Sequence, residues 1–189
     1  MGKMKEVAFY GDELLTRALD RHSSDLARLN ARYGEPLLDP TENLRFLAMT
    51  GAMVASIRRN DALAYGSYEE LVLENGHLGR WSPTSPPELM PAKNCYANAL
   101  TLALEKGYTY VEGYAHSILT VAHAWCEDER GNVVEPTWDA DEGRFYLGVP
   151  MDPHRALAHC AKTGYYGLFC NDWITDLELL RGGYKELIA

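Results

Sequence analysis

The hydrophobic pattern of the chain changes its period at a Pro- and Ser-rich stretch, residues 81–87, and this change limits the folds it can adopt. Before the stretch, apolar residues recur at three- and four-residue steps, as between Leu14 and Leu19, which predicts amphipathic helices. After it, one helical segment is followed by β-prone runs. We therefore predict an α+β fold, in which a helical N-terminal portion (1–80) packs on a core formed by residues 88–189.

Two further helices are expected in the N-terminal portion. One begins at Asp39-Pro40, and its apolar face is formed by Leu44, Leu47, Ala48, Gly51, Val54, Ala55 and Ile57. The other begins at Ser67, because Ser67 and Glu70 have the spacing of a capping box. We interpret these apolar faces as core packing rather than as surfaces for a partner.

The second half of the chain predicts a nucleophile-bearing helix packed on an antiparallel sheet. The helix runs from Cys95 to Lys106 and ends at Gly107. The predicted strands cover 108–114, 122–126 and 133–135, with a turn at 128–132 and a short helix at 172–181. Because the strands are joined by short connections, they should pair as antiparallel neighbours.

Composition excludes several functional classes. The formal net charge of −9 argues against a nucleic-acid-binding protein. No apolar run approaches the roughly 20 residues that span a bilayer, and the charged start is unlike a secretory signal. Four widely spaced cysteines in a chain of 189 residues do not form a disulfide framework. We expect a cytoplasmic protein without a membrane partner, and its oligomeric state is left open.

Three residues have the order and types of a cysteine-nucleophile site. Cys95 lies at a predicted helix start, His123 on one predicted strand and Glu135 on the next. A helix N-terminus and an adjacent imidazolium both favour the reactive thiolate. A carboxylate can fix the tautomer and orientation of the imidazole. This combination predicts attack by sulfur on an acyl group.

The geometry expected for an ideal hairpin leaves alternatives open. With the turn centred near Gly131, residue 138 falls opposite His123, so Glu135 reaches the imidazole only through a bulge or a skewed register. Asp139 is the alternative carboxylate, because it lies closer to the opposite position. His116 is the competing histidine. The aromatic residues near the site could line a cleft or pack in the core; they are Tyr108, Tyr110, Tyr114, Trp125 and Trp138.

The motifs around these residues resemble a known family. They are Cys-Tyr-x-Asn-Ala from Cys95, Tyr-Val-Glu-Gly-Tyr-Ala from Tyr110, His-Ala-Trp from His123 and Glu-Pro-Thr-Trp from Glu135. Together they resemble the transglutaminase-like branch of papain-fold proteins, and small uncharacterised proteins of bacteriophages and bacteria. The resemblance covers about residues 90–150, and Glu135 stands where the family usually has Asp.

The resemblance implies a thiol enzyme that works without a cofactor. Cys95 is then the nucleophile, His123 the general base and acid, and Glu135 the orienting carboxylate. The thiolate would attack an amide or ester carbonyl of a protein or peptide substrate, and water or an amine would resolve the thioester. The competing interpretation is a non-enzymatic papain-fold binding protein, since a fold alone does not define a reaction.

An acyl-transfer site also needs donors for the oxyanion. The backbone N–H of Cys95 is one candidate, because amides in the first helical turn lack intrahelical partners. A second donor could come from Asn94, Lys93 or Trp81. Asn98 lies one helical turn after Cys95, where it either faces the cleft or serves as a structural amide.

We predict no metal site. The chain has additional candidate ligands at Cys126, Cys160, Cys170, His154 and His159. They lack the paired spacings of zinc sites, and the adjacent residues 159 and 160 suit tetrahedral ligation poorly.

Overall fold

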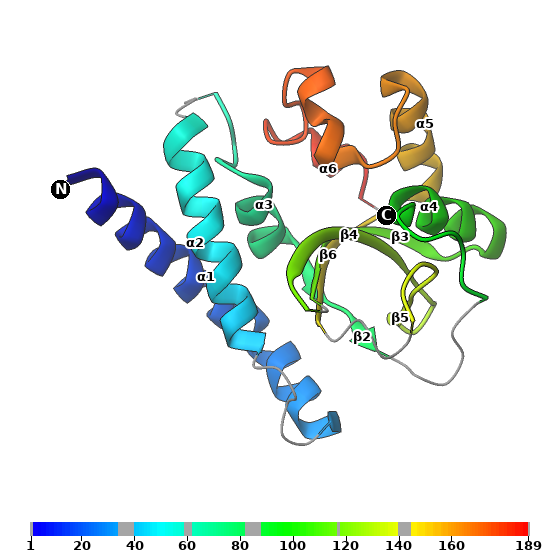
Figure 1. Cartoon of the computed structure of the whole chain (residues 1–189), viewed down its shortest axis with the longest axis horizontal. Coiled ribbons are helices and arrows are strands. Elements are labelled where there is room, and N and C mark those ends of the chain that lie inside the picture. The colour runs from blue at the N-terminus through cyan, green and yellow to red at the C-terminus, as the bar shows by residue number, and fades with distance from the viewer. Residues whose placement is uncertain are drawn as a thin grey trace.

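The computed structural model describes residues 2–33, 40–58, 62–81, 88–116, 118–139 and 145–188. In chain order the helices and strands are α1 (Gly2–Tyr33), α2 (Pro40–Arg58), α3 (Tyr68–Asn75), β1 (His77–Leu78), β2 (Arg80–Trp81), α4 (Cys95–Lys106), β3 (Thr109–His116), β4 (Thr120–Glu127), β5 (Asn132–Val134), β6 (Phe145–Met151), α5 (Pro153–Thr163), α6 (Leu168–Asn171), η1 (Asp172–Thr175) and η2 (Gly183–Glu186). The expected α+β class is confirmed. In Figure 1, α1 and α2 lie together to the left of the curled sheet, and α4 and α5 lie at its upper right.

The strands form a sheet in the order β1-β6-β3-β4-β5-β2. All neighbours are antiparallel except β2 and β5. Only Gly79 separates β1 from β2, so the short segment 77–81 pairs with β6 at its start and with β5 at its end. This segment closes the sheet into a barrel, as the curled strands in Figure 1 show. A Cβ at Gly79 would lie 2.6 Å from Val133, so only glycine fits at the closure.

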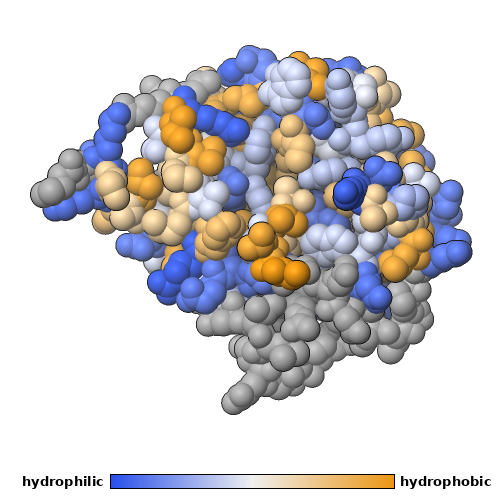
Figure 2. All heavy atoms as spheres, in the orientation of Figure 1, coloured by the Kyte–Doolittle hydropathy of each residue, from blue (hydrophilic) through white to orange (hydrophobic). Residues whose placement is uncertain are grey.

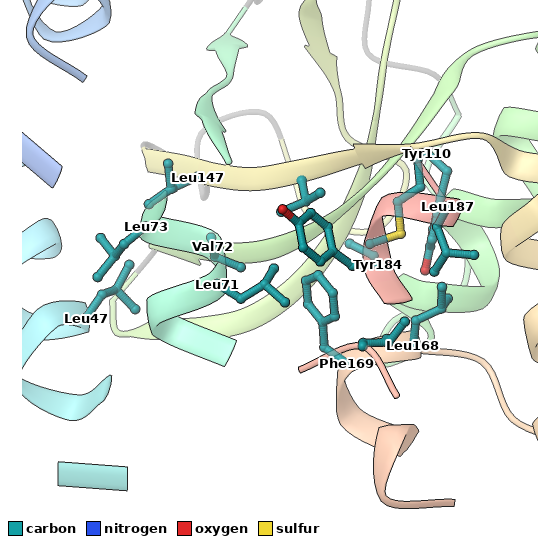
Figure 3. Close-up of a cluster of buried hydrophobic side chains, with 14 of the residues drawn as sticks. Leu47, Leu71, Val72, Leu73, Tyr110, Leu147, Leu168, Phe169, Tyr184 and Leu187 are labelled. Carbon is teal, nitrogen blue, oxygen red and sulfur yellow. The ribbon is translucent and has the colours of Figure 1, made fainter. Parts of the chain in front are cut away.

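The outer face of the barrel carries the main hydrophobic core. Figure 3 shows side chains from distant segments converging there, with Leu47 from α2, Leu71 from α3, Leu147 from β6, Phe169 from α6 and Tyr184 from η2. The inner face holds a smaller buried cluster, formed by Val111, Ala115, Trp125, Val133 and Tyr146. Because successive strand residues alternate between faces, β4 directs His123 and Trp125 towards the interior and Ala124 and Cys126 towards the helices.

Two glycines allow β3, β4 and β6 to approach closely. Gly113 pairs with Gly148, and a Cβ at Gly113 would lie 2.1 Å from the carbonyl oxygen of Leu147. A Cβ at Gly148 would lie 2.5 Å from the Trp125 ring. The large indole of Trp125 can therefore pack directly on the β6 backbone, and this contact fixes the part of β4 that carries His123.

Several expected helix boundaries are confirmed. Ser67 caps α3, since its side chain accepts a hydrogen bond from the backbone N–H of Glu70. Helix α4 begins at Cys95 and ends at Gly107, which adopts the left-handed conformation (φ 72°). In both places the local sequence is sufficient, because a cap depends on only a few consecutive residues.

The helix predicted over 172–181 is wrong. Only the 3₁₀ helix η1 forms, because the buried carboxylate of Asp172 accepts the backbone N–H groups of Leu179 and Leu180 and bends the chain around itself. Asp176 and Leu177 then adopt left-handed backbone conformations (φ 56° and 59°), which no α-helix tolerates. The strand β6 and the helices α5 and α6 were not expected.

Helix α2 buries most of its predicted apolar face, but not its end. Leu44, Leu47 and Ala48 are buried, whereas Ile57 is 76% exposed, so its assignment to the core was wrong. Ile57 extends an exposed stripe formed by Phe46, Met49 and Met53. Figure 2 shows hydrophobic side chains gathered on the molecular surface over α1 and α2.

Two findings concern the expected organisation of the chain. The Pro- and Ser-rich stretch begins at Trp81, the last residue of β2, and its remaining residues, 82–87, lie outside the described residues. Within the described parts of the chain, no helix combines the length and the apolar character needed to cross a membrane.

Candidate active site

The candidate nucleophile is the first residue of α4. Cys95 is half-buried. The carbonyl of Asn94, just before it, accepts the first hydrogen bond of the helix, from the backbone N–H of Asn98. The first backbone N–H groups of a helix have no intrahelical partners, and the helix dipole adds positive charge at this end. The sulfur therefore lies where negative charge is stabilised.

The imidazole of His123 lies between two acidic groups. Its Nε2 is 2.8 Å from Oε2 of Glu135, and its ring is also hydrogen-bonded to the Cys95 thiol. Because Nε2 is engaged by the carboxylate, Nδ1 is the nitrogen that remains for the sulfur. Burial alone lowers the pKa of His123, but the hydrogen bonds and negative charges of Cys95 and Glu135 raise it to about 9. The imidazole is therefore protonated at neutral pH.

Glu135 is held by four donors. Oε1 accepts the backbone N–H groups of Thr137 (2.8 Å) and Trp138 (3.1 Å). Oε2 accepts the Tyr146 hydroxyl (3.1 Å) in addition to His123. Glu135 is only 2% exposed, so this set of donors replaces the water that a carboxylate would otherwise need.

The register that brings Glu135 to His123 differs from the one expected. Strand β5 pairs with β4 only at Val133 and Val134, opposite Glu127 and Cys126. The chain leaves the sheet at Glu135, so the carboxylate turns towards His123 without a bulge. Asp139, the alternative carboxylate, is exposed and is not the partner of the imidazole.

Aromatic rings fix the plane of the imidazole. The ring of Trp138 stacks on His123, with 3.9 Å between centroids and an angle of 14° between planes. Trp125 lies roughly parallel at 6.4 Å. Trp125 belongs to the buried inner cluster and Trp138 packs against it, so both serve core packing, and Trp138 also contacts a reacting group. A stacked protonated imidazole also gains a favourable interaction with the indole.

Asn98 is buried and structural. Its amide nitrogen donates to the Pro91 carbonyl (2.8 Å) and to the Thr137 hydroxyl (3.0 Å). A backbone bond from Met90 to the carbonyl of Pro136 (2.7 Å) reinforces this connection. The segment before the nucleophile is thus tied to the segment that follows Glu135. Of the two interpretations of Asn98, the structural amide fits and the cleft-facing side chain does not.

The remaining candidates lie away from the reacting groups or beside them without a contact. His116 bonds through Nδ1 to the Thr120 hydroxyl (2.9 Å) and does not join the site. Asn94 and Lys93 are exposed just before the helix, and Lys93 has a left-handed backbone (φ 68°). The side chain of Trp81 lies outside the described residues. The backbone N–H of Cys95 is the donor best placed for an oxyanion.

Two participants were missed by sequence reasoning. Tyr146 lies on the unexpected strand β6, and Thr137 was taken only as part of a motif. A tyrosine far along the chain gives no local signal of a bond to Glu135, whereas the dense run of polar and aromatic residues after Glu135 could have suggested a cradle for its carboxylate.

Within the described residues, no three His, Cys, Asp or Glu side chains come together as a set of metal ligands. Comparison of the chain with protein-family models, with curated protein sequences and with solved structures gives no match. The chemistry of the site is therefore inferred from its geometry: a thiol at a helix N-terminus, a protonated imidazole and a buried carboxylate in one chain of contacts.

Proposed function

We propose that this protein is a cysteine-dependent acyl-transfer or amide-hydrolysing enzyme with a Cys95–His123–Glu135 triad, acting on a peptide or isopeptide-type substrate. The observation that carries the proposal is the position of His123, whose Nε2 lies 2.8 Å from Oε2 of Glu135 and whose ring also interacts with the side chain of Cys95. The arrangement of a nucleophile helix against a mainly antiparallel barrel supports a papain-like, transglutaminase-like core.

The proposed reaction begins with the thiolate of Cys95 and the imidazolium of His123. The sulfur attacks the substrate carbonyl, and the oxyanion that forms is stabilised by the backbone N–H of Cys95. When the carbon–nitrogen bond breaks, His123 gives its proton to the leaving amine, and a thioester remains on Cys95. His123 is now neutral and can act as a base.

The second half of the reaction regenerates the thiolate. A water molecule or an amine gives a proton to His123 and attacks the thioester carbonyl, and the carbon–sulfur bond breaks. Glu135 stays ionised throughout, where it stabilises the imidazolium and holds the ring in place. Trp138 prevents the ring from tilting out of the line between the sulfur and Glu135.

The test uses p-nitrophenyl acetate, an activated ester that requires no knowledge of the natural substrate. We expect an acetyl group on Cys95, located by peptide mass spectrometry, to form faster than on Cys170, which is the exposed thiol of the same chain. His123→Ala should slow acetylation of Cys95 about a hundredfold or more, because the sulfur then loses the imidazolium that favours its reactive thiolate form.

The same experiment separates the two candidate classes. If Cys95 is acetylated no faster than Cys170, and His123→Ala changes neither rate, the triad is not active and the protein is better treated as a binding module. If Cys95 is acetylated rapidly, addition of glycinamide to the acetylated enzyme shows whether an amine or water resolves the thioester.

A further inference from the structure

A cavity is lined by the sequence neighbours of both proposed reacting residues. Its volume is about 130 Å3, and its lining includes Tyr96, which follows Cys95, and Ala122, which precedes His123. The rest of its wall comes from α3, β3 and α6.

Aromatic residues make up half of this lining: Tyr68, Tyr96, Tyr114 and Phe169. Tyr68 and Phe169 are stacked, with centroids 5.7 Å apart. The hydroxyl of Tyr96 lies 3.0 Å from the sulfur of Cys170, and Gly167 lies against the Tyr96 ring, where a Cβ would be 3.1 Å away. The rings are thus held in place, and their faces attract cations.

Three carboxylates stand behind these rings. Glu112 lines the cavity with 0% exposure, and it accepts hydrogen bonds from the backbone of Leu168 and Phe169. Asp172 accepts the Tyr68 hydroxyl (3.1 Å), and the hydroxyl of Tyr114 is hydrogen-bonded to Glu69. One carboxylate thus lines the cavity, and two more are bonded to tyrosines that line it.

The pKa values of the tyrosines that line the cavity are shifted upwards. Burial, followed by the charge of a neighbouring carboxylate, raises the pKa of each phenol. The carboxylate is Asp172 for Tyr68, Glu112 for Tyr96 and Glu69 for Tyr114.

Little positive charge balances these carboxylates. Arg58 lies over Tyr68, with 5.1 Å between its guanidinium and the ring centroid. In the part of the chain that the structure describes, no ion pair includes Glu112, Glu69 or Asp172. A ligand that brings a positive charge therefore gains attraction from both the carboxylates and the rings.

We propose that this cavity is a specificity subsite for a primary alkylammonium group of the substrate, such as a lysine side chain. The proposal rests on the proposed function in one respect, because it takes the ligand to be part of the molecule that Cys95 attacks. The rings cover the methylene groups, and the ammonium lies in the field of Glu112, Glu69 and Asp172. An anionic group of the same size is repelled.

The test measures protection of Cys170, whose exposed thiol lines the cavity. It uses the full chain with Cys95→Ser, so that the outcome does not depend on the reactivity of Cys95. Iodoacetamide labels Cys170 in the presence of n-butylammonium, n-butanol or butyrate at constant ionic strength, and mass spectrometry gives the rate. We expect n-butylammonium to half-protect Cys170 at a concentration at least about fivefold below that of n-butanol, with butyrate weakest.

Variants show whether the carboxylates cause the preference. Glu112→Gln should reduce the difference between n-butylammonium and n-butanol, and Glu69→Gln offers the same test without altering a fully buried group. Glu129→Gln removes an equal charge from an exposed turn and should leave the difference unchanged. Equal protection by the ammonium and the alcohol, or no protection by either, overturns the proposal, whereas inactivity of Cys95 towards p-nitrophenyl acetate overturns only the proposed function.

Discussion

Two buried glutamates in this protein accept matching sets of neutral hydrogen-bond donors, but only one of them also pairs with a cation. Glu135 and Glu112 are 2% and 0% exposed. Glu135 accepts two consecutive backbone N–H groups, from Thr137 and Trp138, and one tyrosine hydroxyl. Glu112 accepts the same set of donors, two consecutive backbone N–H groups and one tyrosine hydroxyl, which come from Leu168, Phe169 and Tyr110.

The two glutamates differ in the group that each meets besides these three donors. Glu135 meets the imidazole of His123, while Glu112 lies at the wall of a cavity. Burial raises the pKa of Glu112, although its three hydrogen bonds act in the opposite direction. A set of neutral hydrogen-bond donors can hold a buried carboxylate, but its charge is balanced only when a cation is also present. At Glu135 the protein supplies that cation itself.

Glu135→Ala should have the largest effect on stability. It removes one of the two negative partners of a buried protonated imidazole, and breaking a buried pair in this way costs about 3–5 kcal/mol. Urea denaturation at neutral pH would measure the loss in the free energy of unfolding. A loss below about 1 kcal/mol would mean that His123 is neutral in the folded protein, since a neutral ring needs no counter-charge.

The pair of His123 and Glu135 should also make stability depend on pH. Hydrogen bonds and negative charges raise the pKa of His123 from 6.5 to about 9, so the folded state binds this proton more tightly than the unfolded state. The resulting stabilisation, about 3 kcal/mol, is fully present below pH 6.5 and is lost as the pH rises through 9. Between these limits, the free energy of unfolding should fall less steeply with pH in Glu135→Gln than in the wild type. Identical slopes would show that the carboxylate does not hold the proton.

Glu112→Ala should destabilise the protein less than Glu135→Ala. It leaves the N–H groups of Leu168 and Phe169 without an acceptor but strands no buried cation, so about 1–3 kcal/mol is expected. The same denaturation experiment measures both variants. An equal or larger loss for Glu112→Ala would indicate that the protein already supplies a cation to Glu112.

Phenylalanine substitutions give the most selective effect. Tyr110→Phe and Tyr146→Phe each remove one hydroxyl from a buried carboxylate, at about 1.5–3 kcal/mol. Their costs in stability should be similar, but acetylation of Cys95 by p-nitrophenyl acetate should slow more in Tyr146→Phe. If Tyr110→Phe slows acetylation as much, the two cradles do not act separately.

The local parts of the site could be predicted from the sequence. The start of α4 at Cys95 and its end at Gly107 follow from a few neighbouring residues. The assignment of Glu135 as the partner of His123 comes from the family resemblance of the Glu-Pro-Thr-Trp motif, because an ideal hairpin register places residue 138 opposite the histidine. The expected bulge is not needed, because β5 ends before Glu135. The end of this strand depends on pairing that the sequence does not show.

The long-range parts could not be predicted. The barrel is closed by β1 and β2, each of two residues, which are too short to show any periodicity. Strand β6 contains Gly148 and Pro150, which weaken a strand pattern, although Gly148 is needed for its close approach to Gly113. Tyr146 was missed with this strand, and so was one of the four donors to Glu135.

The most direct measurement is the pH dependence of iodoacetamide labelling at Cys95 and Cys170, resolved by mass spectrometry, in the wild type and in His123→Ala. A thiolate paired with an imidazolium reacts at mildly acidic pH, where an ordinary thiol does not. Desolvation raises the pKa of Cys170, so this residue serves as the slow internal reference. We predict fast labelling of Cys95 at about pH 6 that is lost in His123→Ala. Labelling of Cys95 that is as slow as that of Cys170 and unchanged by the substitution would contradict the triad.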